Sequence, residues 1–365
     1  MRAGRNHAVY PFLGIIFTLL VAGLLIISSA SVVLSEQNFG TPYHYFFRQG
    51  IAALAGLVLM FVIQMVPYRT WQRFAMPILL GSLALMAAAA FTRWGFSAGG
   101  ARRWLVAGPL SIQPSEILKL SLILYLASWL NTKRGEVGRF TSGFIPFLTM
   151  IGVVAVVLVR QPDIGTLIVI MGDAVILYFL GGGRIPQLAA LGVLAAAALS
   201  VIVLVAPYRL ERFTVFLDPA RDPQKSGYHL NQAMIAIGSG GFWGKGFGQG
   251  IQKYNYLPET IGDSVFAVVG EEFGFLGAVT LALLFLGFFL RSVFIARKAP
   301  DLFAKLIVIG FGAIITFQAF VNMAAISGLF PLTGIPLPFI SYGGTSLVVT
   351  LMMCGIILNV SKQTS

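Results

Sequence analysis

Acidic side chains are scarce in this sequence, and several of them gather in one short segment. The chain has 13 aspartate and glutamate residues among 365 positions, and the segment 256–277 holds Glu259, Asp263, Glu271 and Glu272. A carboxylate close to cations in a partly dry groove can act as a general base or help to hold a divalent ion. Asp263 and Glu259, four positions apart, are therefore candidates for such a site, as catalytic base, metal ligand or substrate contact.

A structural role for Asp263 is the alternative. Gly262 breaks the chain before a long apolar run, so Asp263 stands where a carboxylate caps the following helix, a contribution of about 1 kcal/mol. Glu271 and Glu272 come deeper in the same run, where a charge that faces lipid is costly. We expect at least one of these two glutamates to face a polar interior.

Charged residues also open two other apolar runs. Glu116 and Lys119 fall on one face of a helix that begins near Pro114, and a helix N-terminus favours a carboxylate. This pair either holds a helix bundle together or binds substrate. Asp163 follows Pro162 in the stretch "RQPDIG", and we expect it to cap the next helix rather than to act in catalysis.

Basic residues are abundant in the connections between apolar runs, and the chain has a net charge of +12. Arg102 and Arg103 lie in a glycine-rich connection, whereas Arg212 and Lys253 lie in a much longer one, residues 207–263. Such an excess of cations suits an anionic partner such as phosphate, so these four are candidates to bind it. A solvated loop of mixed charge is the alternative.

A proline-rich segment precedes the last apolar run. Residues 328–346 read "GLFPLTGIPLPFISYGGTS", and three prolines within this stretch exclude a regular helix. We expect the segment to face the same cleft as Asp263. There it would offer backbone amides and hydroxyl groups, including that of Ser341.

Membrane helices must position these residues. The chain is 57% hydrophobic and 10% charged, whereas a typical soluble protein is about 25% charged. Apolar runs of helical length give ten candidate spans, at residues 11–33, 50–66, 75–92, 112–130, 144–159, 164–181, 185–206, 264–290, 304–327 and 341–360. Runs of this length favour a helix bundle over a barrel of short strands.

We therefore predict an all-α integral membrane protein, a single polytopic domain over residues 1–365 with a bundle of about ten transmembrane helices. A long extracytoplasmic loop, about 207–263, joins helices 7 and 8 and contains a re-entrant or surface-lying helix near 228–237. With both termini in the cytoplasm, 13 of the 25 lysine and arginine residues lie in short inner segments, as the positive-inside bias predicts.

Several other chemistries find no support in the sequence. Cys354 is the only cysteine, and the three histidines do not have the spacing of a zinc site. The glycine-rich run at 238–250 matches neither the dinucleotide-binding motif nor the phosphate-binding P-loop. We expect no nucleotide cofactor and no nucleic-acid partner.

The motifs that run in order along nearly the whole chain resemble the SEDS family, the shape, elongation, division and sporulation proteins typified by RodA and FtsW. They are "GARRWL" (100–105), "QPSEILKL" (113–120), "RQPDIGT" (160–166), "FLDP" (216–219), "IAIGSGG" (235–241), "YLPETIGDSVFAVVGEEFGFLG" (256–277) and "LFPLTGIPLPFISYGGTS" (329–346). The stretch "QKYNYLPE" favours an FtsW-like member, whereas the short tails are equally RodA-like.

This resemblance implies a multi-pass protein of the bacterial cytoplasmic (inner) membrane that polymerises lipid II, the undecaprenyl-pyrophosphoryl disaccharide-pentapeptide, into peptidoglycan on the outer face. A class B penicillin-binding protein, a transpeptidase, is the implied partner. The family's essential aspartate matches Asp263, its loop tryptophan matches Trp104, and its charged pair matches Glu116 and Lys119. The chain departs from the family at "IGDS" (261–264), where His-Thr-Asp-Phe is common.

The resulting hypothesis makes Asp263 the general base for the acceptor sugar's 4-hydroxyl, which attacks the donor's anomeric carbon in one inverting displacement. Lipid pyrophosphate leaves, neutralised by Arg102, Arg103, Arg212 and Lys253, with Mg²⁺ or Mn²⁺ as the candidate cofactor. A flippase that moves lipid II across the bilayer and a non-catalytic cell-wall scaffold are the alternatives. The charged residues named above are concentrated in the outer half of the predicted bundle. This placement favours a polymerase acting at the outer face over a flippase, which needs a continuous path.

Overall fold

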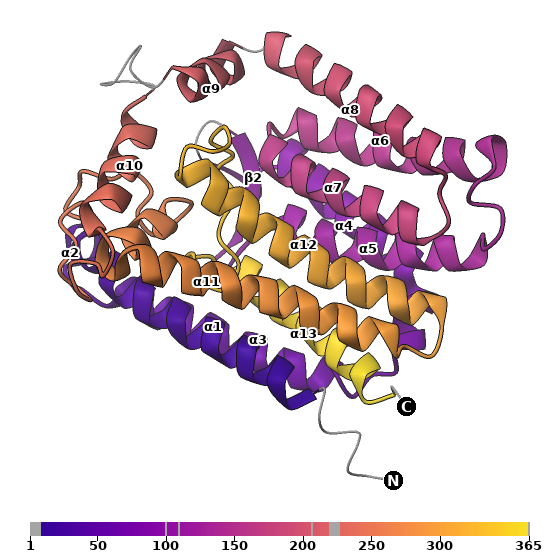
Figure 1. Cartoon of the computed structure of the whole chain (residues 1–365), viewed down its shortest axis with the longest axis horizontal. Coiled ribbons are helices and arrows are strands. Elements are labelled where there is room, and N and C mark those ends of the chain that lie inside the picture. The colour runs from indigo at the N-terminus through magenta and orange to yellow at the C-terminus, as the bar shows by residue number, and fades with distance from the viewer. Residues whose placement is uncertain (1–8, 99–100, 109, 206, 219–226, 364–365) are drawn as a thin grey trace.

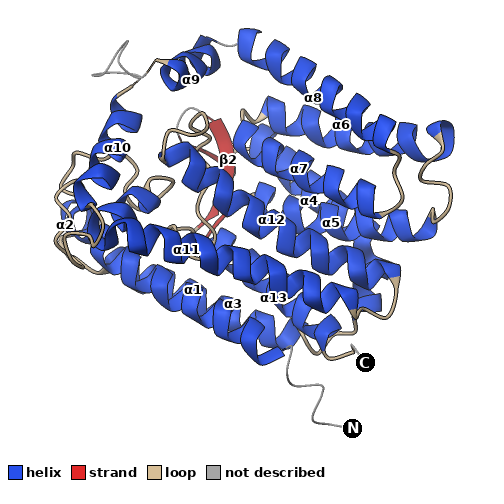
Figure 2. Cartoon of the chain, viewed as in Figure 1, coloured by secondary structure: helices blue, strands red, loops and turns tan. Residues whose placement is uncertain are grey.

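Helices formed by the apolar runs make up most of the structure (Figures 1 and 2). The computed structural model describes residues 9–98, 101–108, 110–205, 207–218 and 227–363. The helices are α1 (Val9–Ala30), α2 (Val32–Phe39), α3 (His44–Ile63), α4 (Tyr68–Phe91), α5 (Pro114–Thr132), α6 (Ile145–Arg160), α7 (Ile164–Leu180), α8 (Ile185–Val205), α9 (Pro207–Leu217), α10 (Tyr228–Gly240), α11 (Val265–Arg297), α12 (Leu302–Ile326) and α13 (Gly344–Ser361). A π-helical turn, Phe140–Phe144, leads into α6.

The helical membrane fold predicted from the sequence is confirmed: nine of the ten predicted spans each overlap one α-helix, and the first, 11–33, covers most of α1 and the first two residues of α2. Within the described residues, seven helices are long and apolar enough to cross a membrane, and two apolar segments, Ile164–Leu180 and Ile185–Val201, are shorter. Helix α5 overlaps the remaining predicted span, and Glu116 and Lys119 lower its hydropathy. The surface-lying or re-entrant helix expected near 228–237 coincides with α10.

The core lies around α12, which runs through the middle of the bundle in Figure 1 and packs against α11, α7, α5 and α13. Its most apolar window is 89% buried, against 28% for that of α3. A helix that is apolar on all sides is stable only when it is surrounded, and here other helices surround it. The two ends of the described chain lie together at the end of the bundle away from α10 (Figure 1).

A small antiparallel sheet forms in the connection between α4 and α5, where the sequence predicted only a loop. Strands β1 (Gly95–Ala98), β2 (Ala101–Ala107) and β3 (Leu110–Ile112) pair in that order, with Phe96 opposite Trp104. Aromatic pairs across strands stabilise such a sheet. The sheet places Arg102 opposite Ser97 and Trp104 opposite Phe96, and Arg103 lies at the irregularity between these two pairs.

Helix α11 is broken at Gly274, whose φ of 65° and ψ of −162° are not helical. The break leaves backbone groups without helical partners, and a glycine-rich turn supplies new ones. The amides of Lys245 and Gly246 donate to the carbonyls of Glu271 and Glu272, both at 3.0 Å. Because buried backbone groups need partners, the turn and the break stabilise each other.

Candidate active site

Asp263 lies at the end of the connection that leads into α11, but it does not cap that helix. The residue at the N-cap position is Ser264, and its side chain makes no capping hydrogen bond. The Asp263 side chain is only 14% exposed, and its Oδ1 atom is buried without a hydrogen-bond partner. The nearest basic group to Oδ1 is Nε2 of His229, at 4.0 Å. The carboxylate is thus held without the contacts that a structural cap requires.

Burial raises the pKa of Asp263 to about 6, and the Arg212 guanidinium and the groups of Ser264 oppose that rise. Burial, and secondly the charge of Asp263, also raise the pKa of Glu259. The pKa of His229 is lowered by burial and by Arg212, which leaves its imidazole neutral near pH 7. A carboxylate with a pKa near the working pH is well suited to general-base catalysis.

Of the four basic residues predicted to bind phosphate, Arg212 is the one that the structure places beside Asp263. Its Nη1 donates to the carbonyl of Leu332 at 3.2 Å, and the guanidinium remains exposed. Gly334 separates the two charges: a Cβ built there would lie 3.8 Å from Oδ2 of Asp263 and 3.9 Å from Nη1 of Arg212. The base and a cation therefore border one small space next to the proline-rich segment.

The backbone around Asp263 is held by polar side chains from distant parts of the chain. The Asn322 Nδ2 atom of α12 donates to the carbonyls of Asp263 and Ile335, both at 2.8 Å. The Ser341 hydroxyl donates to the carbonyl of Gly262 at 2.6 Å and accepts from the amide of Leu337 at 2.8 Å. The expected convergence of the proline-rich segment and Asp263 is present. Because the Ser341 hydroxyl already donates one hydrogen bond and accepts another within this region, Ser341 has the role of supporting the loop.

The Glu116–Lys119 pair lies behind this loop. The Lys119 Nζ and a Glu116 carboxylate oxygen are 2.6 Å apart, and the two side chains are 5% and 3% exposed. Lys119 also donates to Gln318 at 2.7 Å, and Gln318 donates to the carbonyl of Pro336 at 2.8 Å. The pair thus connects α5 through α12 to the segment that borders Asp263. This geometry favours the structural explanation of the pair over direct substrate binding.

The residues of β2 have different surroundings from one another. Arg103 donates from Nε to the carbonyl of Gln161 at 3.0 Å and from Nη2 to that of Pro162, which fixes the sheet to the turn before α7. Arg102 is exposed, and Trp104 is partly buried. In the same turn, Asp163 accepts from the amide of Thr166 at 3.4 Å, so its predicted role as a helix cap is confirmed.

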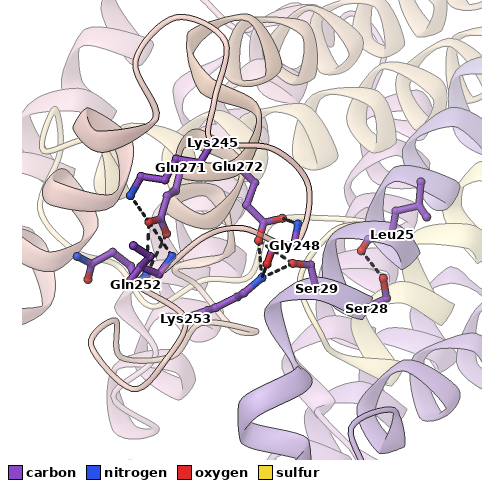
Figure 3. A network of polar contacts seen from close by, with 10 residues as sticks. Leu25, Ser28, Ser29, Lys245, Gly248, Gln252, Lys253, Glu271 and Glu272 are labelled. Carbon is purple, nitrogen blue, oxygen red and sulfur yellow. Dashed lines mark hydrogen bonds and ion pairs between the residues drawn. The ribbon is translucent and has the colours of Figure 1, made fainter.

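Lys253 is not placed where the sequence hypothesis needs it (Figure 3). Its Nζ atom lies 2.7 Å from a Glu272 carboxylate oxygen and also donates to the Ser29 hydroxyl at 2.7 Å and the Gly248 carbonyl at 2.8 Å. The residue is only 5% exposed. The proposed binding of pyrophosphate by Lys253 is therefore corrected to a structural role, because all three donors of its ammonium are used internally.

Both deep glutamates face a polar interior, which confirms and extends the expectation that at least one would. Glu271 is 0% exposed and lies 2.8 Å from Nζ of Lys245, and it also accepts from the amides of Ile251 and Gln252. Figure 3 shows the two glutamate clusters side by side beneath the glycine-rich turn. Buried charges of this kind are stable only when they are paired.

Three supporting residues escaped the sequence analysis. His229 was considered only as a zinc ligand, although its Nε2 lies 2.5 Å from the Ser264 hydroxyl. Asn322 and Gln318 are polar residues within an apolar span, and the sequence alone could have indicated them because such residues are costly in a membrane unless they find partners.

Within the described parts of the chain, no group of three or more His, Cys, Asp and Glu side chains is arranged to hold a metal ion.

The fold and the site define a class: a multi-pass integral membrane protein with a buried carboxylate, one oxygen of which has no hydrogen-bond partner, and an adjacent arginine at one end of its helix bundle. Residues 11–365 match the FtsW, RodA and SpoVE family, described as "Cell cycle protein". The chain belongs to this family, which is the one that its motifs resemble.

Known relatives match over nearly the whole chain. The "Probable peptidoglycan glycosyltransferase FtsW" of Geobacter sp. (strain M18) is 38% identical over 341 residues, 93% of each chain. "Stage V sporulation protein E" of Bacillus subtilis (strain 168) is 38% identical over 344 residues, 94% of each.

Solved structures are also similar to this one. One comes from a study of the "Structural coordination of polymerization and crosslinking by a peptidoglycan synthase complex"; it has a TM-score of 0.79 and 30% identity, and covers 97% of this chain and 98% of its own. The crystal structure of the Thermus thermophilus rod shape determining protein RodA has a TM-score of 0.70 and 28% identity, with 97% of each chain covered.

Proposed function

We propose that this protein is a peptidoglycan glycosyltransferase that polymerises lipid II at the outer face of the bacterial cytoplasmic membrane. The observation that carries the proposal is the environment of Asp263, a buried carboxylate whose pKa is raised to about 6 and whose Oδ1 has no partner. Membership of the family and the glycosyltransferase name of its relatives support the reaction class. Both termini would then lie in the cytoplasm.

The proposed reaction needs one proton acceptor. The 4-hydroxyl of the acceptor sugar gives its proton to Asp263 as its oxygen bonds to the anomeric carbon of the donor. The bond from that carbon to the lipid pyrophosphate breaks on the opposite side, so the configuration inverts. Arg212, which borders the same space as Asp263, is placed to offset the charge of the departing pyrophosphate.

A divalent cation at this site would be Mg²⁺ or Mn²⁺. Mg²⁺ is usually held by one or two protein carboxylates together with substrate phosphates, and Asp263 beside Arg212 offers such a partial set rather than a complete cage. When bound, the ion would supply charge neutralisation at pyrophosphate. Asp263 and Glu259, whose pKa is also raised by burial, are the residues that would hold it.

We further propose that the protein works with a class B penicillin-binding protein, which crosslinks the new strand. The similarity to a chain from a peptidoglycan synthase complex supports such an association. Relatives named FtsW support an FtsW-like role in cell division over an elongation role.

The test is polymer formation from fluorescent lipid II by the purified protein in nanodiscs, with and without the penicillin-binding protein and with added Mg²⁺ or EDTA. We expect glycan chains from the native protein and none from Asp263→Asn, whereas Asp301→Asn, which alters the helix cap of α12 at the other end of the bundle, should retain activity. Full activity of Asp263→Asn would refute the assignment of the base. Movement of lipid II between leaflets without any polymer would instead favour a flippase.

A further inference from the structure

Aromatic side chains form an exposed surface around the break in α11. We call Phe242, Trp243, Phe247, Phe275 and Leu276 the aromatic rim; Trp243 is 76% exposed and Phe275 is 59% exposed. The ring centroids of Phe242 lie 5.3 Å from those of Trp243 and 5.9 Å from those of Phe275. The glycine-rich turn and the helix break thus share one continuous aromatic surface.

The aromatic rim continues directly into a membrane-facing surface. Phe275 and Leu276 belong to α11, one of the helices long and apolar enough to span a membrane. Immediately beside Leu276, a cavity of about 400 Å³ opens between α1 and α11, with an almost wholly apolar lining that includes Leu25, Phe273 and Leu281. A soluble loop has no reason to place its aromatic rings next to a lipid-facing helix, whereas a loop at the bilayer interface does.

The polar groups of this region point the other way. Glu271 and Glu272 are 0% and 1% exposed, and each pairs internally with a lysine, Lys245 or Lys253 (Figure 3). A carboxylate turned outward would resist insertion among lipids, and here neither of the two is exposed. Rings face out and both carboxylates face in, which is the reverse of a water-exposed loop.

The backbone of the turn is also compatible with contact with lipid. Irregular backbone is tolerated at membrane depth only where its polar groups are satisfied. The amides of Phe275 and Leu276 donate to the carbonyls of Gly241 and Phe242 at 2.9 and 3.2 Å, in addition to the two bonds from the turn to the Glu271 and Glu272 carbonyls. The exposed surface therefore presents rings rather than unpaired backbone groups.

We propose that the aromatic rim inserts into the interface of the lipid bilayer and anchors the connection that carries Asp263. Tryptophan, which combines a large apolar surface with one polar N–H group, concentrates at the headgroup level, and phenylalanine and leucine side chains of interfacial segments are buried at the boundary between headgroups and acyl chains. This anchoring is independent of the proposed reaction. Its consequence for that reaction is that the base would be held near the depth at which a lipid-linked pyrophosphate lies.

The experiment places a spin label at position 243, as Trp243→Cys, in nanodiscs of phosphatidylcholine and phosphatidylglycerol. Cys354 is fully buried, so labelling selects the introduced thiol. We expect high accessibility to oxygen and low accessibility to a water-soluble nickel chelate, which corresponds to the boundary between headgroups and acyl chains. A label at Gln363→Cys, on an exposed residue after α13, is the aqueous control and should show the reverse.

A second measurement avoids the label and uses the fluorescence of Trp243 itself. This contribution is the difference in fluorescence between the native protein and Trp243→Phe. Bromine on the upper acyl chain quenches nearby tryptophan, so we expect this difference to fall at least twofold in nanodiscs of brominated lipid. Access of the nickel chelate to position 243 at the level of the Gln363 control, together with the absence of quenching, would overturn the proposal. If the nickel chelate reaches position 243 in the protein alone and is excluded only when the penicillin-binding protein is added, the proposal is also overturned, and the rim is identified as a protein interface.

Discussion

The side-chain amide of Asn322 donates a 2.8 Å hydrogen bond to the backbone carbonyl of Asp263. The same nitrogen donates at 2.8 Å to the carbonyl of Ile335 in the proline-rich segment. One amide group in the most deeply buried span therefore fixes two chain segments that border the site. The position of the catalytic candidate depends on a residue that lies 59 positions away in the sequence.

Removal of this amide should affect catalysis more than stability. We expect Asn322→Leu to lower the polymerisation rate at least tenfold, because two carbonyls lose their donor and the loop relaxes. Asn359→Leu is the matched control, since Asn359 holds the backbone of Gln64 and Tyr68 at the other end of the bundle. Comparable losses of thermal stability with a rate loss only in Asn322→Leu would support the assignment, and equal rates in the two variants would contradict it.

The pH dependence of the reaction should report Asp263. A general base works when deprotonated, and burial raises the pKa of this carboxyl to about 6. We expect the rate at limiting substrate to rise about tenfold per pH unit below that value and to level off above it. A rate independent of pH between 4.5 and 7.5 would show that the protonation state of Asp263 does not control the reaction.

Arg212 should shift that profile. Its positive charge favours the ionised carboxylate and so lowers the pKa of Asp263. Arg212→Gln is therefore expected to move the midpoint of the pH–rate curve to higher pH, whereas Arg212→Lys should leave the midpoint nearly unchanged. If Arg212 served only to bind pyrophosphate, Arg212→Gln would lower the rate at every pH without moving the midpoint.

The buried Glu116–Lys119 pair should be far more sensitive to single than to double replacement. Lys119→Met leaves the Glu116 carboxylate buried without its partner, a loss on the order of 3–5 kcal/mol. The double variant Glu116→Gln with Lys119→Met should regain most of the thermal stability, measured as the unfolding midpoint in detergent. If the double variant is as unstable as Lys119→Met, the loss of thermal stability does not come from the unpaired Glu116 carboxylate.

Gly244 should tolerate no side chain. Its φ is 83°, and a Cβ there would lie 2.2 Å from the carbonyl oxygen of Glu272, so Gly244→Ala should separate the turn from α11 and lower both yield and activity strongly. Gly248 has a similar φ of 80° with nothing within 4 Å of a Cβ, so Gly248→Ala should cost only about 1 kcal/mol of backbone strain. Similar behaviour of the two alanine variants would rule out the close packing of the turn.

Much of the architecture could be read from local patterns. Apolar runs located the membrane helices, because the cost of placing polar groups in lipid acts on each segment separately. The cap at Asp163 was predictable because it depends on residues only three apart. The sheet that holds Trp104 was missed, since it is built from three short strands in a glycine-rich stretch with little apolar alternation.

The sequence by itself determined that the chain lies in a membrane, which family it resembles and which carboxylate is the best candidate for a base. Only the tertiary structure decided how the charges are used. Lys253 pairs with Glu272 and with Ser29, a serine 224 positions away, whereas Arg212 remains beside Asp263. The physical reason is that a charge entering a low-dielectric interior needs a partner, and the folded arrangement of distant helices determines which partner it meets.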